Sequence, residues 1–390
     1  MNRIYIILLL VVVCACSSGE KTVLENIEQI LVEVHNASLD ASSFIEKIEI
    51  IPLETNDSSL IANLKKVMYD KEMDVYAIYS RHQIVSTFSG NGDFIGSSKK
   101  MKGRGPQEYY MAVDIKFNSY LQGIDFLNPY GTVYTYSLDF KFLTKRKVNS
   151  KIVVNSLMAL SPNNYIFTYP SLWTDQEVLF ANLETQEMNN ASYSGTISSR
   201  NTMDKECFYK EGDKLYFVPT GINYYFYQID AEKMKLTPII YLDFGSSEIK
   251  EKDLPGRASG KRSGSDEDIS RYSEEIGERY LFLRKSDYII PLVKFFNEDY
   301  VYVFFTKNSR NASSFIFDRK REKGFLLKVG KPFNMQSCFA IVDNILLAIC
   351  KPDEVYGYVD ANLMSLEERH KMEQLKEDDN PVILKYYLKK

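Results

Sequence analysis

The sequence predicts an all-β protein, a six-bladed β-propeller with short helical insertions. The first observation is composition: 13% of the 390 residues are aromatic, with 28 Tyr and 23 Phe, which favours half-buried strands. The second is a repeat, because apolar segments separated by polar turns recur at about 40 residues, the period of a propeller blade. Six such units fit between residues 60 and 365. Small sheets of this kind bury their faces when they pack radially.

The N-terminus is typical of an exported lipoprotein. An apolar run over residues 4–13 is too short to span a bilayer, and Val13-Cys14-Ala15-Cys16 resembles a bacterial lipobox. We therefore expect a signal peptide at 1–15, lipidation of Cys16, and a tether over 16–40. An ordinary cleaved signal peptide is the alternative. With a lipid anchor, the mature chain is attached to a membrane of the cell envelope, on the periplasmic or the cell-surface side.

The propeller domain is expected over residues 41–390. Its first strand, residues 45–50, alternates apolar and charged side chains and ends at Pro52. The clearest unit follows, with strands at 75–78, 84–88 and 94–96, and Asn91-Gly92 predicts a hairpin turn between the last two.

Two segments interrupt the repeat. Residues 246–290 form an insertion between the fourth and fifth units, with a helix expected at 268–284. A second short helix is expected at 365–377, where Ser365 and Glu368 have the spacing of a capping box. The final strand, 382–387, is expected to pair with the first strand or with the edge of a terminal unit, since a ring of blades needs its ends joined.

Four motifs resemble the six-bladed β-propeller lipoproteins of Gram-negative bacteria, which are similar in outline to NHL-repeat propellers. They are Ile51-Pro52-Leu53-Glu54-Thr55, Val85-Ser86-Thr87-Phe88 with Gly92-Asp93-Phe94-Ile95, Gly103-Arg104-Gly105-Pro106-Gln107-Glu108-Tyr109, and Asp379-Asn380-Pro381-Val382. The third motif departs from the family pattern, because Gln107 stands where the family usually has Gly. The resemblance implies the fold, and most members have no established activity.

The basic, Gly-rich stretch at residues 101–110 lacks the GK[ST] ending of a phosphate-binding loop. We expect a turn in which Gly103 and Gly105 adopt special backbone angles, with a positive φ at Gly105, and Glu108 accepts hydrogen bonds from loop amides. The alternative is a ligand-binding role for Arg104, Glu108 and Tyr109 at the mouth of the ring.

No other motif marks a catalytic, cofactor or metal site. His35, His82 and His370 lack the spacing of metal ligands, and Asp70, Asp74, Asp114 and Asp125 are interpreted as turn acceptors near strand ends. The net charge of −4 indicates no basic face, so no nucleic-acid partner is expected.

Cysteines and tyrosines each leave two possibilities open. Cys207, Cys338 and Cys350 are expected to be buried thiols, with a Cys338–Cys350 pair as the alternative. The aromatic run at residues 223–227 is expected to pack between blades, although aromatic rings at a ring mouth could stack on sugars or peptide side chains.

Binding is the function that this pattern favours. We expect a binding or scaffolding module for a glycan, peptide or protein partner, with blade-connecting loops and the 246–290 insertion as its recognition surface. The alternative is a propeller enzyme of the lyase or lactonase type with a divalent metal in the central channel. No catalytic residue is identified for it.

Overall fold

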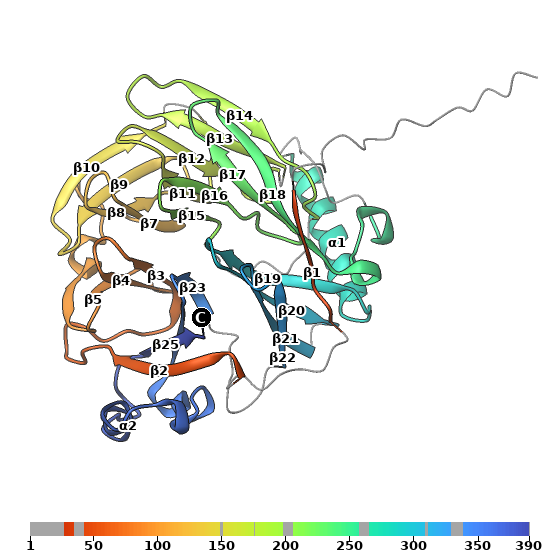
Figure 1. The fold of residues 1–390 in the computed structure, drawn as a ribbon. Coiled ribbons are helices and arrows are strands. Elements are labelled where there is room, and N and C mark those ends of the chain that lie inside the picture. The colour runs from red at the N-terminus through yellow and green to blue at the C-terminus, as the bar shows by residue number, and fades with distance from the viewer. Residues whose placement is uncertain are drawn as a thin grey trace, which may run out of the picture.

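The strands of the chain surround a central channel (Figure 1). The structure is a computed structural model that describes residues 27–34, 43–148, 151–174, 176–197, 206–256, 265–308, 311–328 and 338–389. In these residues the strands form six separate sheets, each with four antiparallel strands, and one sheet carries an additional strand. The predicted six-bladed β-propeller is confirmed.

Within each blade, the first strand lies at the channel and the fourth at the rim, because the first strands of neighbouring blades contact one another. Blades 1 to 3 follow directly in sequence. Blade 1 comprises β3 (Leu64–Asp70), β4 (Val75–Ser80), β5 (Val85–Ser89) and β6 (Phe94–Ser97). Blade 2 comprises β7 (Asp114–Asn118), β8 (Gly123–Leu127), β9 (Thr132–Ser137) and β10 (Phe142–Lys147). Blade 3 comprises β11 (Ser156–Ala159), β12 (Asn164–Thr168), β13 (Glu177–Asn182) and β14 (Met188–Ser192).

Blades 4 to 6 complete the ring. Blade 4 comprises β15 (Phe208–Glu211), β16 (Lys214–Phe217), β17 (Tyr225–Asp230) and β18 (Lys235–Asp243). Blade 5 comprises β19 (Ile289–Phe296), β20 (Tyr300–Lys307), β21 (Asn311–Asp318) and β22 (Lys323–Lys328). Blade 6 comprises β23 (Cys338–Val342), β24 (Ile345–Cys350), β25 (Val382–Leu388) and β2 (Ile45–Pro52). Short 3-10 helices lie at Ser98–Met101, Gly245–Ser247, Glu251–Asp253, Pro352–Gly357 and Ala361–Leu363.

The two ends of the propeller domain meet in blade 6, as predicted. Strand β2 pairs antiparallel with β25, with Ile48 opposite Tyr386 and Ile50 opposite Leu384. The alternation in β2 buries Ile48 and Ile50 in the core of this blade. Because the outer strand comes from the N-terminus and the inner three from the C-terminus, the ring closes without a covalent link between them.

The second predicted helix is α2 (Leu366–Glu373), and it supports this closure. The Ser365 hydroxyl caps it by accepting a hydrogen bond from the Glu368 amide at 3.2 Å. The Glu368 carboxylate, which is buried, accepts a hydrogen bond from the Ile50 amide of β2 at 2.6 Å. The glutamate of the expected capping box thus binds the closing strand.

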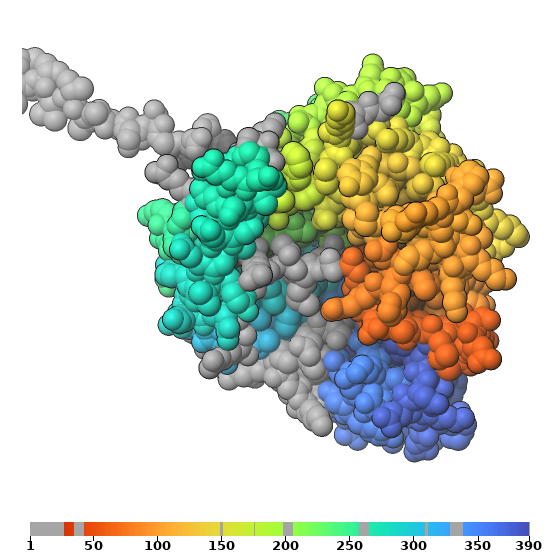
Figure 2. Space-filling view, turned by 180° about the vertical axis from the view of Figure 1, so that it is seen from behind, coloured from red at the N-terminus to blue at the C-terminus, as the bar shows by residue number. Residues whose placement is uncertain are grey.

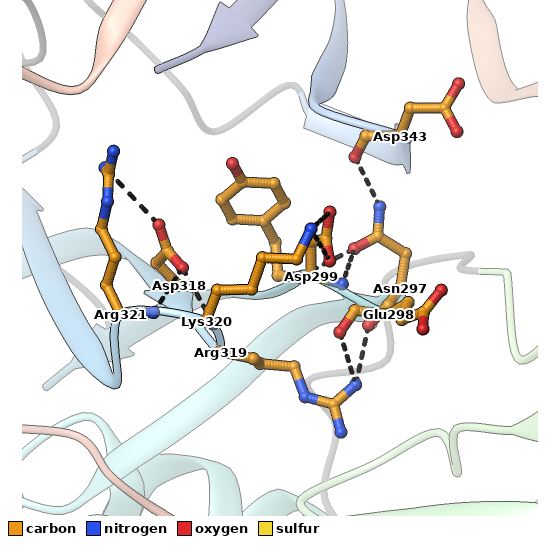
Figure 3. A network of polar contacts seen from close by, with 9 residues as sticks. Asn297, Glu298, Asp299, Asp318, Arg319, Lys320, Arg321 and Asp343 are labelled. Atoms are coloured by element: carbon orange, nitrogen blue, oxygen red, sulfur yellow. Dashed lines mark hydrogen bonds and ion pairs between the residues drawn. The ribbon is translucent and has the colours of Figure 1, made fainter. Parts of the chain in front are cut away.

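A short strand, β1 (Glu28–Leu31), lies within the stretch expected to be a tether. It pairs in parallel with β18 and adds a fifth strand to blade 4. The pairing is stabilised by burial of the Ile30 side chain and of Val32, which follows the strand. The side chain of Arg319 holds it in place with a bond to Glu28 Oε1 at 3.0 Å. Figure 3 shows the surrounding polar network, in which Arg319 also binds the Asn297 carbonyl and the Asn297 amide binds the Asp343 carbonyl of blade 6.

The insertion between blades 4 and 5 contains α1 (Asp266–Leu283), close to the predicted helix. Its Arg279 side chain is buried and donates hydrogen bonds to the Pro255 carbonyl at 2.9 Å and to Glu251 at 3.2 Å. Figure 2 shows that the α1 region and the C-terminal region around α2 stand apart on the rim.

In the interior, Cys207, Cys338 and Cys350 are buried free thiols, as the first of the two interpretations predicted.

Candidate functional site

The central channel contains a cavity of about 1130 Å³. Residues from all six blades line it, principally the innermost strands β3, β7, β11, β15, β19 and β23. An innermost strand has one neighbour in its own blade, so its other edge faces the channel. Aromatic side chains such as Phe117, Tyr120 and Phe339 share the wall with charged ones. The cavity is therefore both apolar and able to form hydrogen bonds.

Four charged side chains form a cluster at the wall of this cavity, two of them buried (Lys66 and Asp114) and two half-buried. Lys66 of blade 1 places its Nζ 2.7 Å from Asp114 Oδ1 of blade 2 and 3.0 Å from Glu206 Oε2, which directly precedes the first strand of blade 4. The same ammonium donates a hydrogen bond to the Ile115 carbonyl at 3.0 Å. Lys66 thus links blade 1 to blade 2 through Asp114, and links blade 1 to the start of the opposite blade 4 through Glu206.

Lys116 completes the cluster, which we call the channel cluster (Lys66, Asp114, Lys116 and Glu206). Its Nζ lies 2.6 Å from Glu206 Oε1 and also bonds to the Phe208 carbonyl. The second oxygen of Asp114 accepts a hydrogen bond from the Leu157 amide of blade 3 at 3.2 Å. Blades 1 to 4 are consequently joined at one point of the channel wall.

Within the channel cluster, the opposite charges favour the charged forms of Lys66 and Glu206. Burial lowers the pKa of Lys66, but Asp114 and Glu206 outweigh it and hold this pKa above its usual value. Burial raises the pKa of Glu206, but Lys116 and Lys66 outweigh it and the net pKa is lowered. For Asp114, burial raises the pKa against the opposing effect of Lys66. Two ammonium groups face two carboxylates, so the cluster needs no ligand charge to neutralise it.

A second ion pair spans the channel further along the same strands. Lys210 of β15 lies 3.3 Å from the Glu72 carboxylate, in the turn that follows β3. Blades 1 and 4 are opposite one another in a ring of six. Because Glu206 precedes β15 and Lys210 lies near its end, opposite blades are bridged at two levels of the channel.

The ligand-binding candidates from the sequence lie elsewhere. Arg104, Glu108 and Tyr109 are in the loop between blades 1 and 2, outside the set of described residues that line the cavity. Arg104 is exposed, with its guanidinium 4.7 Å from the centroid of the Tyr110 ring. Tyr109 is fully buried, and its hydroxyl donates to the Gln83 carbonyl at 2.7 Å. The structure therefore separates these residues from the cavity, and a ligand role for them stays a prediction.

The loop at residues 101–110 is held together by Glu108. Its carboxylate accepts a hydrogen bond from the Gly105 amide at 2.8 Å, which confirms the expected acceptor role. The expected positive φ at Gly105 is wrong, because neither Gly103 nor Gly105 has a backbone angle in that region. The reason for glycine is close approach: a Cβ on Gly103 would lie 1.9 Å from Glu108 Oε2.

Two of the four aspartates interpreted as turn acceptors, Asp114 and Asp125, lie in strands and do not accept hydrogen bonds from turn amides. Asp114 belongs to the channel cluster, and Asp125 is buried inside blade 2, where it accepts hydrogen bonds from Thr135 at 2.5 Å and Asn118 at 2.8 Å. Burial raises the pKa of Asp125 to about 6. The interpretation holds for Asp70, which accepts from the Met73 amide at 2.9 Å.

The remaining candidate residues, Cys16 and the three histidines, are not among the described residues that line the cavity. Cys16 and His35 lie outside the described residues. His82 lies in a turn and forms a hydrogen bond with Asn63. His370 lies within α2, is exposed, and forms a hydrogen bond with Gln374. Among the described residues, no group of three or more His, Cys, Asp or Glu side chains is arranged to hold a metal ion. No helix in the described part of the chain is long and apolar enough to cross a membrane.

Sequence reasoning missed the channel cluster because its residues carry no motif. A weak signal is present: Asp114-Ile115-Lys116 and Lys65-Lys66 put charges into strands that otherwise alternate apolar residues, at the first strand of a unit. In a propeller the first strand faces the channel, so charges there are candidates for the channel wall. Glu206 has no such signal.

A family model and a solved structure each match nearly the whole chain. A family model described as "Domain of unknown function (DUF4934)" matches residues 27–387. A solved structure of a "Putative exported protein" from Bacteroides fragilis NCTC 9343 is similar with a TM-score of 0.69 and 18% identity, covering 93% of this chain and 100% of that chain. The Pan2 WD40 domain of Neurospora crassa matches with a TM-score of 0.36 and 7% identity, over 75% of this chain and 74% of that chain. No curated protein matches the chain.

Proposed function

Since the chain belongs to the family described as a domain of unknown function (DUF4934), we propose its function from the geometry of the channel. The protein is an extracytoplasmic, lipid-anchored binding module, and its ligand is a short peptide, or the end of a protein partner, held in the central cavity. The single observation that carries this proposal is the cavity of about 1130 Å³ lined by all six blades. Ligand sites are typically concave, mainly apolar and equipped with a few fixed polar groups.

The chemistry of the wall favours a peptide. The channel-facing edges of the innermost strands present backbone N–H and C=O groups, which an extended peptide satisfies by strand addition. Aromatic side chains such as Phe117 and Phe339 offer apolar contacts for its side chains. The carboxylates of Asp114 and Glu206 are bound by lysine ammonium groups, which favours binding over catalysis by a carboxylate-held metal.

A screen with a matched pair of variants tests the proposal. Thr220 lines the cavity in the loop between β16 and β17, so Thr220→Trp narrows it. Thr185 is exposed in the turn after β13, so Thr185→Trp adds the same bulk away from the cavity. Peptides that raise the melting temperature of the wild type should do so for Thr185→Trp and lose the effect in Thr220→Trp. Equal shifts in all three proteins would refute the cavity as the site.

The anchor has its own support and its own test. It rests on the lipobox resemblance of Val13-Cys14-Ala15-Cys16, and the similar Bacteroides fragilis protein carries a name that describes it as exported. Cys16→Ala should move the protein from the detergent phase to the aqueous phase in a Triton X-114 partition. Cys14→Ala, which keeps a small residue before the modified position, should leave it in the detergent phase. Partition of Cys16→Ala into detergent would contradict the anchor.

A further inference from the structure

A second, smaller hollow lies between blades 3 and 4, away from the central channel. It has a volume of about 390 Å³ and is lined by Gln176, Gly195, Tyr225, Tyr241, Glu248 and their neighbours. The loop at residues 194–197 forms one wall, and the beginning of β17 with the end of β18 forms the other. We call this hollow the tyrosine groove.

Two tyrosine rings that stack on one another form one wall of the tyrosine groove. Tyr225 and Tyr241 are opposite one another on β17 and β18, with ring centroids 4.9 Å apart and planes at 28°. Both side chains are half-buried, whereas their neighbours Phe226 and Leu242 are fully buried in the core that faces blade 5. The run at residues 223–227 therefore divides its aromatic rings between the blade interior and this groove.

The groove is fixed in shape by the opposite wall. Asn223 is buried and donates hydrogen bonds to Thr196 Oγ1 at 2.7 Å and to the Ser194 carbonyl at 3.2 Å, which joins the two walls. Gly195 has a φ of +82°, and a Cβ there would lie 3.0 Å from the Tyr225 ring. The Tyr225 ring is thus held at a set distance from the loop, so little ordering remains to be done when a ligand binds.

A carboxylate stands beside the rings. Glu248 accepts hydrogen bonds from the Tyr241 hydroxyl at 2.6 Å and from the Phe244 amide at 3.0 Å. Burial and Glu248 both raise the pKa of Tyr241, so its hydroxyl stays protonated and donates. A carboxylate has about four acceptor positions, and these bonds leave capacity for further donors. The nearby Glu251 is bound by Arg279 of the insertion.

We propose that the tyrosine groove binds a neutral saccharide ring. The apolar C–H face of a pyranose matches an outward, electron-rich ring face of the stacked Tyr225–Tyr241 pair, and its hydroxyl groups are donors for Glu248. A phenylalanine side chain would also pack on the rings, but it carries no donor for the remaining acceptor positions of Glu248. This site is separate from the central cavity, so the two proposals stand or fall independently.

The test is isothermal titration with four neutral trisaccharides, cellotriose, maltotriose, xylotriose and chitotriose, at millimolar concentration. At least one should bind the wild type. Tyr225→Leu keeps apolar volume but removes the flat ring, and should weaken binding about tenfold, as expected for loss of roughly 1.4 kcal/mol. Glu248→Gln should weaken it severalfold. Tyr225→Phe keeps the ring, and Tyr130→Ala removes an exposed tyrosine of blade 2; both should bind as the wild type does.

Three results would overturn the proposal. The first is that no trisaccharide binds the wild type. The second is that Tyr225→Leu, shown to be folded by its circular dichroism spectrum, binds as well as the wild type. The third is that the tripeptide Ala-Phe-Ala binds more tightly than every trisaccharide and loses affinity in Tyr225→Leu, since the groove would then be a peptide site.

Discussion

The loop at residues 101–110 and the channel cluster teach opposite lessons about where a binding site is found. The loop stands out in sequence, but its polar groups satisfy one another, with Glu108 bound to the Gly105 amide. The cluster lies in ordinary strands, yet Lys66 and Glu206 join opposite blades at the wall of a large cavity. The glycine at position 103 marks the close approach of Glu108, whereas charges in an innermost strand mark a channel.

The largest effect is expected at the cluster. Lys66→Met leaves Asp114 and Glu206 without their shared ammonium, and removing one partner of a buried ion pair costs about 3–5 kcal/mol. Urea unfolding at neutral pH measures this loss. Lys145→Met is the matched control, because the Lys145 ammonium is on an exposed side chain 5.0 Å from the Tyr134 ring centroid and its loss should cost at most about 1 kcal/mol. Equal losses in the two variants would show that the cluster does not hold the blades.

The next effect is expected in the loop. Gly103→Ala puts a Cβ where Glu108 Oε2 now lies, so the carboxylate moves and the Gly105 amide loses its acceptor. The expected cost is about 0.5–1.5 kcal/mol, the net worth of one hydrogen bond, because Gly105 is only half-buried. The same substitution in a Glu108→Ala background should cost clearly less. If both backgrounds lose the same stability, close approach of Glu108 is not the reason for glycine.

The channel cluster should contribute to the pH dependence of stability through Glu206. The pKa of Glu206 is lowered from its usual 4.5, because Lys116 and Lys66 outweigh the effect of burial. Its contribution is therefore complete above pH 4.5 and is lost as the pH falls through the lowered value. Glu206→Gln should flatten the fall of the urea midpoint in this acidic range. A profile as steep as that of the wild type would contradict the assignment.

The smallest effect is expected for Arg104→Ala. The guanidinium is exposed and contacts the Tyr110 ring, an interaction worth about 0.5–1 kcal/mol at the surface. Tyr110→Ala removes the other partner and should cost a similar amount in the same urea experiment. A loss above about 2 kcal/mol in Arg104→Ala alone would show that Arg104 has a buried role.

Sequence patterns predicted the blades well because each blade repeats a local signal. The period-two alternation of residues 45–50 places Ile48 and Ile50 in the core, and the end-to-end pairing of β2 with β25 follows from the need to close a ring. A helix was also predicted at 268–284, and the observed helix Asp266–Leu283 begins two residues earlier, where Ser265 caps it by accepting a hydrogen bond from the Asp268 amide.

Long-range contacts explain what the sequence did not predict. The pairing of β1 with β18 joins residues more than 200 positions apart in the sequence, and no local sequence pattern predicts it. Lys66 and Glu206 meet across the channel for the same reason. The glycine at 103 was expected to serve a special backbone angle, yet its neighbour Glu108 is what excludes a side chain.

A crystal structure of the protein with the tightest-binding peptide of the screen tests the central claim most directly. The cavity model predicts electron density for the peptide inside the channel, against the innermost strands that line the cavity and with Thr220 at its side. Peptide density at residues 101–110 or on the outer rim, with the channel free of peptide, would contradict it.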